Sequence, residues 1–280
     1  MNSRLEKNKK ITHEIDSEKR KKTTKIIVKI ISIILVTIFS LLCFSMFIGA
    51  KYLVVKEYKI TSNKLPSSFH GIKIVQFSDL LYPSFNEKDL DNLKNKINEL
   101  KPDIIVFTGN VKRLDYELTK NDINILSKFF NSLESSINKY AIYGTNDKNF
   151  LDILENSFTI LDNSENVIYN KEIDSIKIIG FNSNDVNTTK ISEESNYSIC
   201  LINNPDNYDK IKDKCDLTLA GNTLGGEIKI PFYKGILTNN KYYKDYYQEY
   251  NMYISNGIGN NYKVRLFNQP SISLYRLNKY

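Results

Sequence analysis

Five apolar runs in this sequence end in short polar segments whose side chains could take part in metal or phosphate chemistry. The segments are "SDLLY", "TGNV", "GTND", "INNP" and "GNTLGG", which carry Asp79, Asn110, Asp147, Asn203 and Asn222. Carboxylate and amide oxygens are ligands for hard cations. Activation of a water by two metal ions, however, needs several anionic oxygens and imidazoles at fixed positions. The segments therefore resemble active-site loops in layout but lack most of the side chains that the chemistry needs.

The apolar runs before these segments are predicted strands, and the first three alternate with helical patterns. In chain order the predicted elements are strand 71–79, helix 87–100, strand 103–110, helix 119–135 and strand 140–147. This alternation predicts a parallel sheet with covering helices, and ligand sites in such sheets lie beyond the carboxyl ends of the strands. A stretch at 52–66 is predicted to be an extended arm, and the remainder is strand-rich. We expect one α/β domain with the five polar segments at one edge.

The order of the five segments resembles that of the calcineurin-like metallophosphoesterases, and especially the bacterial branch with an N-terminal membrane anchor. That family has D-x-H, G-D, G-N-H-D/E, a later strand ending in His, and G-H-T-H-G-G-Q. The corresponding stretches are "FSDLLY", "FTGNV", "IYGTND", "LINNPD" and "LAGNTLGGE", within about residues 70–276. The resemblance implies a two-sheet β-sandwich flanked by helices and a site for two metal ions that clamp phosphate oxygens.

At the positions that match the family's metal site, this chain has mostly residues that bind metals poorly. Asp79 matches the first Asp and Asp147 the last residue of G-N-H-D, whereas the other matched positions carry Leu81, Asn110, Thr145, Asn146, Asn203, Asn222 and Leu224. Asn146 stands where the family has its catalytic His. One anionic and three neutral oxygens suit Ca²⁺ or Mg²⁺ poorly. We therefore expect no bound metal, and the alternative is one divalent cation near Asp79.

The intact core pattern and the lost ligands predict a catalytically inactive relative. Its role would be binding, regulatory or scaffolding, through a partner protein, an envelope component or a ligand in the old pocket. The alternative is an active, metal-dependent phosphoesterase with an altered or single-metal site around Asp79, Asn110, Asn146, Asp147 and Asn222. A third hypothesis is an anchored scaffold that uses no pocket.

Three further features have both a structural and a functional interpretation. Arg265, in "VRLFNQP", could contact a phosphate or make a structural salt bridge. Tyrosines 243, 246, 247 and 250 have helical spacing, which predicts an aromatic face that packs on the core or binds a glycan or protein. His70 is interpreted as structural, and since the other histidine, His13, lies in the tail, no Ser–His–Asp triad is indicated.

The N-terminal part predicts a membrane anchor. Residues 30–50 are 21 residues without a charge, which as a helix reach about 30 Å, one hydrocarbon thickness. A cleaved signal peptide is the alternative, but its apolar core is usually about 7–15 residues. Residues 1–29 carry ten basic and four acidic residues, whereas the whole chain has a net charge of +7. We expect a basic cytoplasmic tail (1–29), a single-pass anchor (30–50) in the cell membrane and an extracytoplasmic domain (52–280), and no nucleic-acid partner.

Cys200 and Cys215 both lie in or beside apolar runs, "YSICLIN" and "KCDLTLA". Free cysteines are among the most buried residue types, so we expect two unpaired core cysteines. One disulfide outside the cell is the alternative. No C-x-x-C pair occurs, so the sequence indicates neither a zinc finger nor a thioredoxin-like motif.

Overall fold

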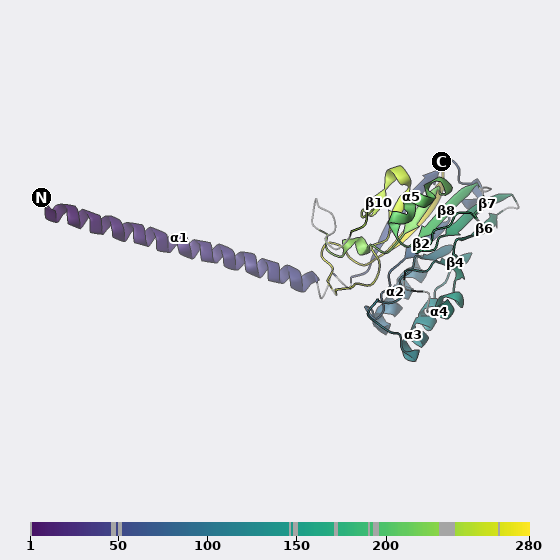
Figure 1. Ribbon diagram of the computed structural model, residues 1–280, viewed down its shortest axis with the longest axis horizontal. Coiled ribbons are helices and arrows are strands. Elements are labelled where there is room, and N and C mark those ends of the chain that lie inside the picture. Colours follow the sequence, from purple (N-terminus) through teal and green to yellow (C-terminus); the bar gives the residue numbers. More distant parts are fainter. Residues whose placement is uncertain are drawn as a thin grey trace. The chain divides into compact units, whose positions relative to one another are not determined.

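The computed structural model describes residues 2–45, 49, 52–145, 147, 151–170, 173–189, 191–192, 196–229, 239–262 and 264–280. It divides into an N-terminal unit that ends at Phe44 and a domain that begins at Ser45. The N-terminal unit is one helix, α1 (Asn2–Phe44), so the basic tail is helical as well (Figure 1). Its part from Asp16 to Phe44 is long and apolar enough to cross a membrane. The last residues of the predicted anchor, 46–48 and 50, lie outside the described residues.

The described part of the domain contains short helices and two sheets. The helices are α2 (Glu87–Glu99), α3 (Lys120–Asn131), α4 (Leu151–Glu155) and α5 (Tyr208–Ile211). The strands are β1 (Val54–Ser62), β2 (Lys73–Phe77), β3 (Ile104–Phe107), β4 (Asn138–Ala141), β5 (Thr159–Ile160), β6 (Ser164–Asn170), β7 (Asp174–Gly180), β8 (Tyr197–Ile202), β9 (Leu217–Ala220), β10 (Tyr246–Tyr247), β11 (Met252–Ile254) and β12 (Ser271–Lys279).

The strands form two six-stranded sheets, which confirms the predicted two-sheet α/β architecture. The first sheet has the order β1-β12-β2-β3-β4-β5 and the second has the order β10-β11-β9-β8-β7-β6. Strands β2 to β5 are parallel as expected, but β12 inserts antiparallel to β2, so the first sheet is mixed. The predicted extended arm is strand β1, which pairs with β12 from Val54↔Ser271 to Ser62↔Lys279.

Alternate residues of the central strands point to different hydrophobic cores, as the period of two of a β-strand requires. In β2, Ile74 packs into the core that both sheets share, whereas Val75 and Phe77 pack with residues of α2 and α3. A third core lies on the other face of the second sheet, where Ile211 of α5 packs. Figure 1 shows α2, α3 and α4 gathered on one side of the sheets. The domain is therefore a sandwich with helices on its outer faces.

Helix α2 begins at Glu87 as predicted, whereas α3 begins one residue later than predicted, at Lys120, and ends earlier, at Asn131. Asn86 and Asp89 form a capping box at the start of α2, and Thr119 and Asp122 form another at the start of α3. In each box the first side chain accepts from the backbone N–H three residues on, and the acidic side chain accepts from the cap's own N–H. These caps fix the first turn of each helix.

The tyrosine-rich segment is not a helix. Tyr246 and Tyr247 form β10, a short turn follows, and β11 returns antiparallel to β10. The rings pack on one another and on the domain: the Tyr242 ring lies 5.2 Å from the Tyr247 ring, and the Tyr246 ring lies 4.3 Å from that of Tyr253. The prediction of a helical aromatic face is wrong, and packing onto the domain is what the structure shows for these rings.

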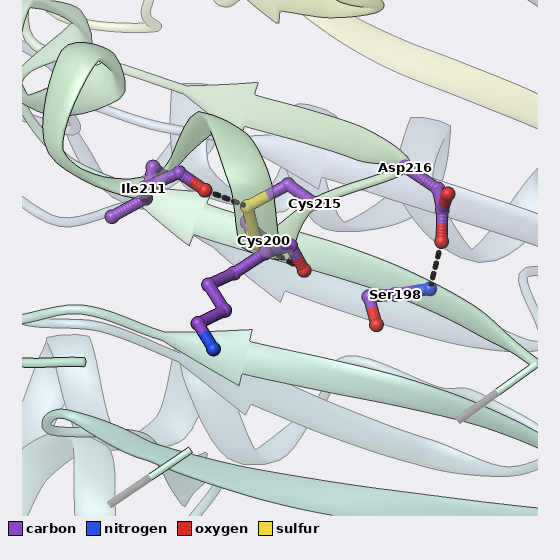
Figure 2. The surroundings of a disulfide bond; sticks show 6 residues. Ser198, Cys200, Ile211, Cys215 and Asp216 are labelled. Atoms are coloured by element: carbon purple, nitrogen blue, oxygen red, sulfur yellow. Dashed lines mark hydrogen bonds between the residues drawn. A yellow bond between two sulfur atoms is a disulfide. The ribbon is translucent and has the colours of Figure 1, made fainter. Parts of the chain in front are cut away.

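Cys200 and Cys215 are bonded to each other, so the expectation of two unpaired cysteines is wrong. Cys200 in β8 and Cys215 just before β9 form a disulfide with Cα atoms 5.7 Å apart (Figure 2). The link is possible because β8 and β9 are neighbouring parallel strands. Next to it, Ser198 N donates to Asp216 Oδ2 at 2.9 Å, which also ties the two segments together.

We expect the disulfide to contribute substantially to stability. The two cysteines are 15 residues apart in sequence, and closing a loop of that size removes about 3 kcal/mol of conformational entropy from the unfolded chain. A Cys200→Ser/Cys215→Ser variant should lose about this amount in urea unfolding. A Cys43→Ser variant, which removes the free cysteine, is the control. Equal unfolding midpoints for all three proteins would contradict the prediction.

Candidate functional site

The polar segments meet at one edge of the domain, at the carboxyl ends of β2, β3 and β9. Asp79 N donates to Gly109 O at 2.8 Å, Gly259 N donates to Asp79 O at 2.7 Å, and Gly221 N donates to Asn203 O at 3.0 Å. These backbone bonds hold neighbouring loops together around a pocket of about 240 Å³. The pocket is lined by Asp79, Leu81, Asn110, Lys112, Leu114, Thr145, Asn222, Leu224 and Asn261. Six of these nine residues were predicted from sequence as remnants of a metal site.

Three of the predicted residues form a closed hydrogen-bond network in the pocket. Asn110 Nδ2 donates to Asp79 Oδ1 at 2.6 Å and to Asn222 Oδ1 at 2.9 Å. Asn222 N donates to the second carboxylate oxygen, Asp79 Oδ2, at 2.9 Å. Both amide hydrogens of Asn110 are thus used, and each oxygen of Asp79 accepts at least one bond. The network satisfies the buried carboxylate with protein donors alone, as a buried polar group requires.

The loops keep an unusual backbone at the positions of the predicted site. Asp79, Leu81, Asn110, Asn222 and Leu224 all have positive φ, between 47° and 68°. Asn and Asp visit this left-handed region readily, but a leucine does so only under strain. The two leucines therefore hold a backbone shape that their side chains do not favour.

The other predicted residues lie around the pocket in different ways. Asp147 is fully buried, and its carboxylate accepts from the backbone N–H groups of Asn110, Val111 and Gly144 at 2.6, 2.9 and 2.7 Å. Burial raises the pKa of Asp147 above its usual range, although these backbone donors oppose the shift. Asp147 therefore fastens loops together and does not line the pocket.

Two further predicted residues differ in burial: Asn203 is buried, whereas Thr145 is exposed. Asn203 is completely buried, and its Nδ2 donates to Thr108 O at 2.8 Å, while its Oδ1 has no hydrogen-bond partner among the described residues. Thr145 is exposed and lines the pocket. Asn146, which matches the family's catalytic His, lies outside the described residues.

The donor set does not fit a pair of divalent metal ions. In the part of the chain that the structure describes, no three His, Cys, Asp or Glu side chains gather where they could hold a metal ion. Among the described residues that line the pocket, Asp79 is the only one with a carboxylate. Asn110 presents N–H groups to Asp79, and a cation needs lone pairs at that point. Leu81 and Leu224 offer no ligand atom at all.

Arg265 lies behind the pocket wall and is fully buried. Its Nη1 donates to Asn256 O at 2.7 Å and its Nη2 donates to Gly259 O. Burial lowers the pKa of Arg265 to about 10, so it remains protonated at neutral pH. The carboxylate of Glu227, itself 2% exposed, attracts this charge. The guanidinium is thus directed to backbone carbonyls of the loop after β11, in place of the phosphate contact or salt bridge considered from sequence.

His70 lies away from the pocket. Its Nδ1 accepts a hydrogen bond from Lys279 N at 3.2 Å, at the end of β12. This contact fits the structural role predicted for it.

Three pocket residues were missed from sequence. Lys112 and Leu114 follow Asn110 in the same loop, and Asn261 lies in "SNGIGNN" near the C-terminus. Lys112 Nζ donates to Tyr116 O at 2.6 Å and lies 3.5 Å from Glu117 Oε1. The Gly- and Asn-rich composition around Asn261 was a signal of a turn, but only the fold shows that this turn faces Asp79.

Asp79 should make the stability of the domain depend on pH. Burial raises its pKa to about 6, although hydrogen bonds from Asn110 and Asn222 oppose the shift. Because the folded pKa exceeds the unfolded value, the folded state holds the proton more tightly, and stability falls as pH rises from about 4 to about 6. The loss from this group amounts to about 3 kcal/mol.

The measurement is the free energy of urea unfolding at several pH values for the natural chain and for Asp79→Asn, which cannot titrate at this position. We expect the difference between the two proteins to change between pH 4 and pH 6 and to be flat above it. Parallel profiles over this range would show that Asp79 keeps an ordinary pKa.

Comparison with known proteins supports the resemblance seen in the sequence. No family model matches the chain. It is 30% identical over 242 residues to the metallophosphoesterase YkuE of Bacillus subtilis, covering 79% of this chain and 84% of YkuE. It is 28% identical over 195 residues to a metallophosphoesterase of Aquifex aeolicus, covering 62% of this chain and 71% of that protein. A shorter match, 36% identical over 89 residues, covers 30% of this chain and 26% of the UDP-2,3-diacylglucosamine pyrophosphatase LpxG of Chlamydia muridarum.

The match to YkuE extends over most of both chains, and the two-sheet sandwich with its loops at one edge agrees with it. The chain belongs to the metallophosphoesterase family.

Proposed function

We propose that this chain is a membrane-anchored, catalytically inactive metallophosphoesterase that acts by binding a partner or ligand at the cell envelope. One observation carries the proposal. Asn110 donates from its amide to both Asp79 and Asn222, so N–H groups occupy the centre where two metal ions would need shared anionic oxygens. A chain that relied on two metal ions would not place a donor there.

Two further observations support inactivity. Asp147, the second carboxylate near the pocket, already accepts three backbone N–H groups, and recruiting it as a ligand would leave those buried donors unpaired. Leu81 and Leu224 place apolar side chains on the pocket wall. The described pocket lining offers amides, a threonine hydroxyl, one lysine, one buried carboxylate and leucine surface, which suits binding better than hydrolysis.

The disulfide and the charge of the tail support the proposed location of the domain. Disulfides persist in oxidising compartments and are rare in the cytosol, so the Cys200–Cys215 bond supports a domain outside the cytoplasm. The basic residues of 1–29 support a cytoplasmic N-terminus by the positive-inside rule. Both observations support the same orientation of a single-pass anchor, for which the apolar helix Asp16–Phe44 is long enough.

A second candidate is an active phosphoesterase with one divalent cation near Asp79. The local similarity to LpxG, a pyrophosphatase by name, favours it. In this case Asn110 and Asn222 would have to turn their oxygens toward the ion and give up the present network. Phosphoester hydrolysis that requires a divalent metal ion and is lost when Asp79 is replaced would distinguish this candidate from the first.

The test counts metal ions per chain. The full-length protein in detergent is incubated with Mn²⁺ or Zn²⁺, freed of excess metal and analysed by elemental mass spectrometry, and its hydrolysis of bis(p-nitrophenyl) phosphate is measured in parallel. We expect no more metal than in Asp79→Ala and no metal-dependent hydrolysis. One or more ions per chain, lost in Asp79→Ala together with hydrolysis, would establish the second candidate.

A further inference from the structure

The edge of the domain that carries the pocket is also the edge at which the chain enters the domain. Val54, the first residue of β1, donates from its N–H to Pro270 O at 2.9 Å, and Ser271 N donates to Gly257 O at 3.2 Å. Gly257 in turn is packed against Asp79, since a Cβ at Gly257 would lie 2.9 Å from Asp79 Cβ. The start of β1 is thus connected to the pocket by these two hydrogen bonds and by the packing of Gly257 against Asp79.

Large apolar side chains are exposed on the loops of this edge. Leu114 lines the pocket and is 75% exposed, and Tyr262, next to the lining residue Asn261, is 66% exposed. Tyr52 and Phe267, on the segments that lead into β1 and β12, are 62% and 57% exposed. We call these four residues the apolar rim. Exposed tyrosines are typical of interfaces between an apolar phase and water, because the ring is apolar and the hydroxyl is polar.

Exposure alone does not identify a contact surface, because the opposite end of the domain also exposes apolar residues. Ile173, directly before β7, and Tyr169, near the end of β6, are 86% and 69% exposed. They lie at the end of the second sheet where β7, β8 and β9 begin, away from the pocket. At the pocket edge, Phe267 has a φ of 53° and is nevertheless 57% exposed. A bulky residue adopts this left-handed conformation only where the surrounding structure holds it.

We propose that the apolar rim contacts the lipid surface of the membrane, so that the pocket opens toward lipid headgroups. The proposal rests on the membrane anchor of the proposed function and is independent of whether the pocket is catalytic. Ser45, which directly follows the last residue of α1, already belongs to the domain: it is fully buried, and its carbonyl oxygen accepts from Arg265 N at 3.3 Å. Arg265 lies in the loop that also carries Tyr262 and Phe267. A chain that leaves the anchor and enters the domain at this loop keeps the rim edge near the bilayer, whereas Ile173 lies at the opposite end of the strands.

Site-specific fluorescence on the full-length chain tests the rim. Cys43→Ser removes the free cysteine, and Cys200 and Cys215 are held in a disulfide. A nitrobenzoxadiazole label is then attached to Leu114→Cys or Tyr262→Cys, with Ile173→Cys and Tyr169→Cys as equally exposed controls at the other end. Each protein is reconstituted into vesicles of phosphatidylethanolamine and phosphatidylglycerol, with and without a lipid that carries a nitroxide on its headgroup.

We expect several-fold stronger quenching at positions 114 and 262 than at positions 173 and 169, with a blue shift of emission at the first two only. Equal quenching at all four positions, in protein that resists an alkaline carbonate wash, would overturn the rim contact and leave the anchor intact. Release of the protein by that wash would overturn the anchor and the rim contact together. A blue shift that grows with protein density and is not quenched by the nitroxide lipid would assign the rim to a second copy of the chain and overturn the proposal.

Discussion

An Arg265→Leu variant is expected to lose about 3–5 kcal/mol of stability, the range found when one partner of a buried charged pair is removed. The guanidinium is fully buried and donates to the carbonyls of Asn256 and Gly259. Leucine fills part of the volume but leaves these carbonyls without donors. It also leaves Glu227, 2% exposed, without the positive charge that now opposes the rise of its pKa on burial.

The Arg265→Leu substitution should also disturb the pocket. The loop after β11 that Arg265 holds also donates from Ile258 N to Ser78 O at 2.9 Å and from Gly259 N to Asp79 O at 2.7 Å. Urea unfolding of the full-length chain measures the loss. Arg276→Leu is the matched control, because Arg276 is exposed and pairs with Glu57 on the surface, where an ion pair contributes at most about 1 kcal/mol. Similar losses in the two variants would contradict a structural role for Arg265.

The position of the site could be predicted from sequence, but part of its lining could not. Asp79, Asn110 and Asn222 each follow an apolar run, and because parallel strands end at one edge, their convergence follows from local pattern. Asn261 and Lys112 belong to loops whose course depends on how distant strands pair. Asp147 was placed near the site correctly, yet no sequence pattern indicates that its carboxylate is taken by backbone N–H groups.

The errors in the fold have a common cause, since each depends on contacts between segments far apart or on a short ambiguous pattern. Strand β12 inserts between β1 and β2. The residue periodicity of β12 indicates a strand but does not indicate which strands it pairs with. Cys200 and Cys215 pair because β8 and β9 are adjacent, which composition does not reveal. The spacing of Tyr243, Tyr246, Tyr247 and Tyr250 fits a helix, but over so few residues it fits a strand and turn as well.

An Asn110→Asp variant is expected to be about 3–5 kcal/mol less stable than the natural chain at neutral pH when divalent metal is absent, as for an uncompensated buried charge. Asn110 Nδ2 lies 2.6 Å from Asp79 Oδ1. The substitution removes both donated bonds and places a second carboxylate against a buried one, and two carboxylates at such a distance favour sharing a proton. Folded-state pKa values raised in this way make the destabilisation small near pH 4 and large above pH 6.

The same variant tests whether the donor amide of Asn110 keeps divalent metal out of the pocket. If the donor amide of Asn110 is the barrier, Mn²⁺ should stabilise Asn110→Asp in thermal unfolding, reversibly with EDTA, because a ligand that binds only the folded state raises its stability. The natural chain should not respond. Asn251→Asp is the matched control, since Asn251 also has a positive φ of 43° but is exposed and outside the pocket. A natural chain that gained as much stability from Mn²⁺ as Asn110→Asp would show that the amide network yields to metal, and the inactive interpretation would then be wrong.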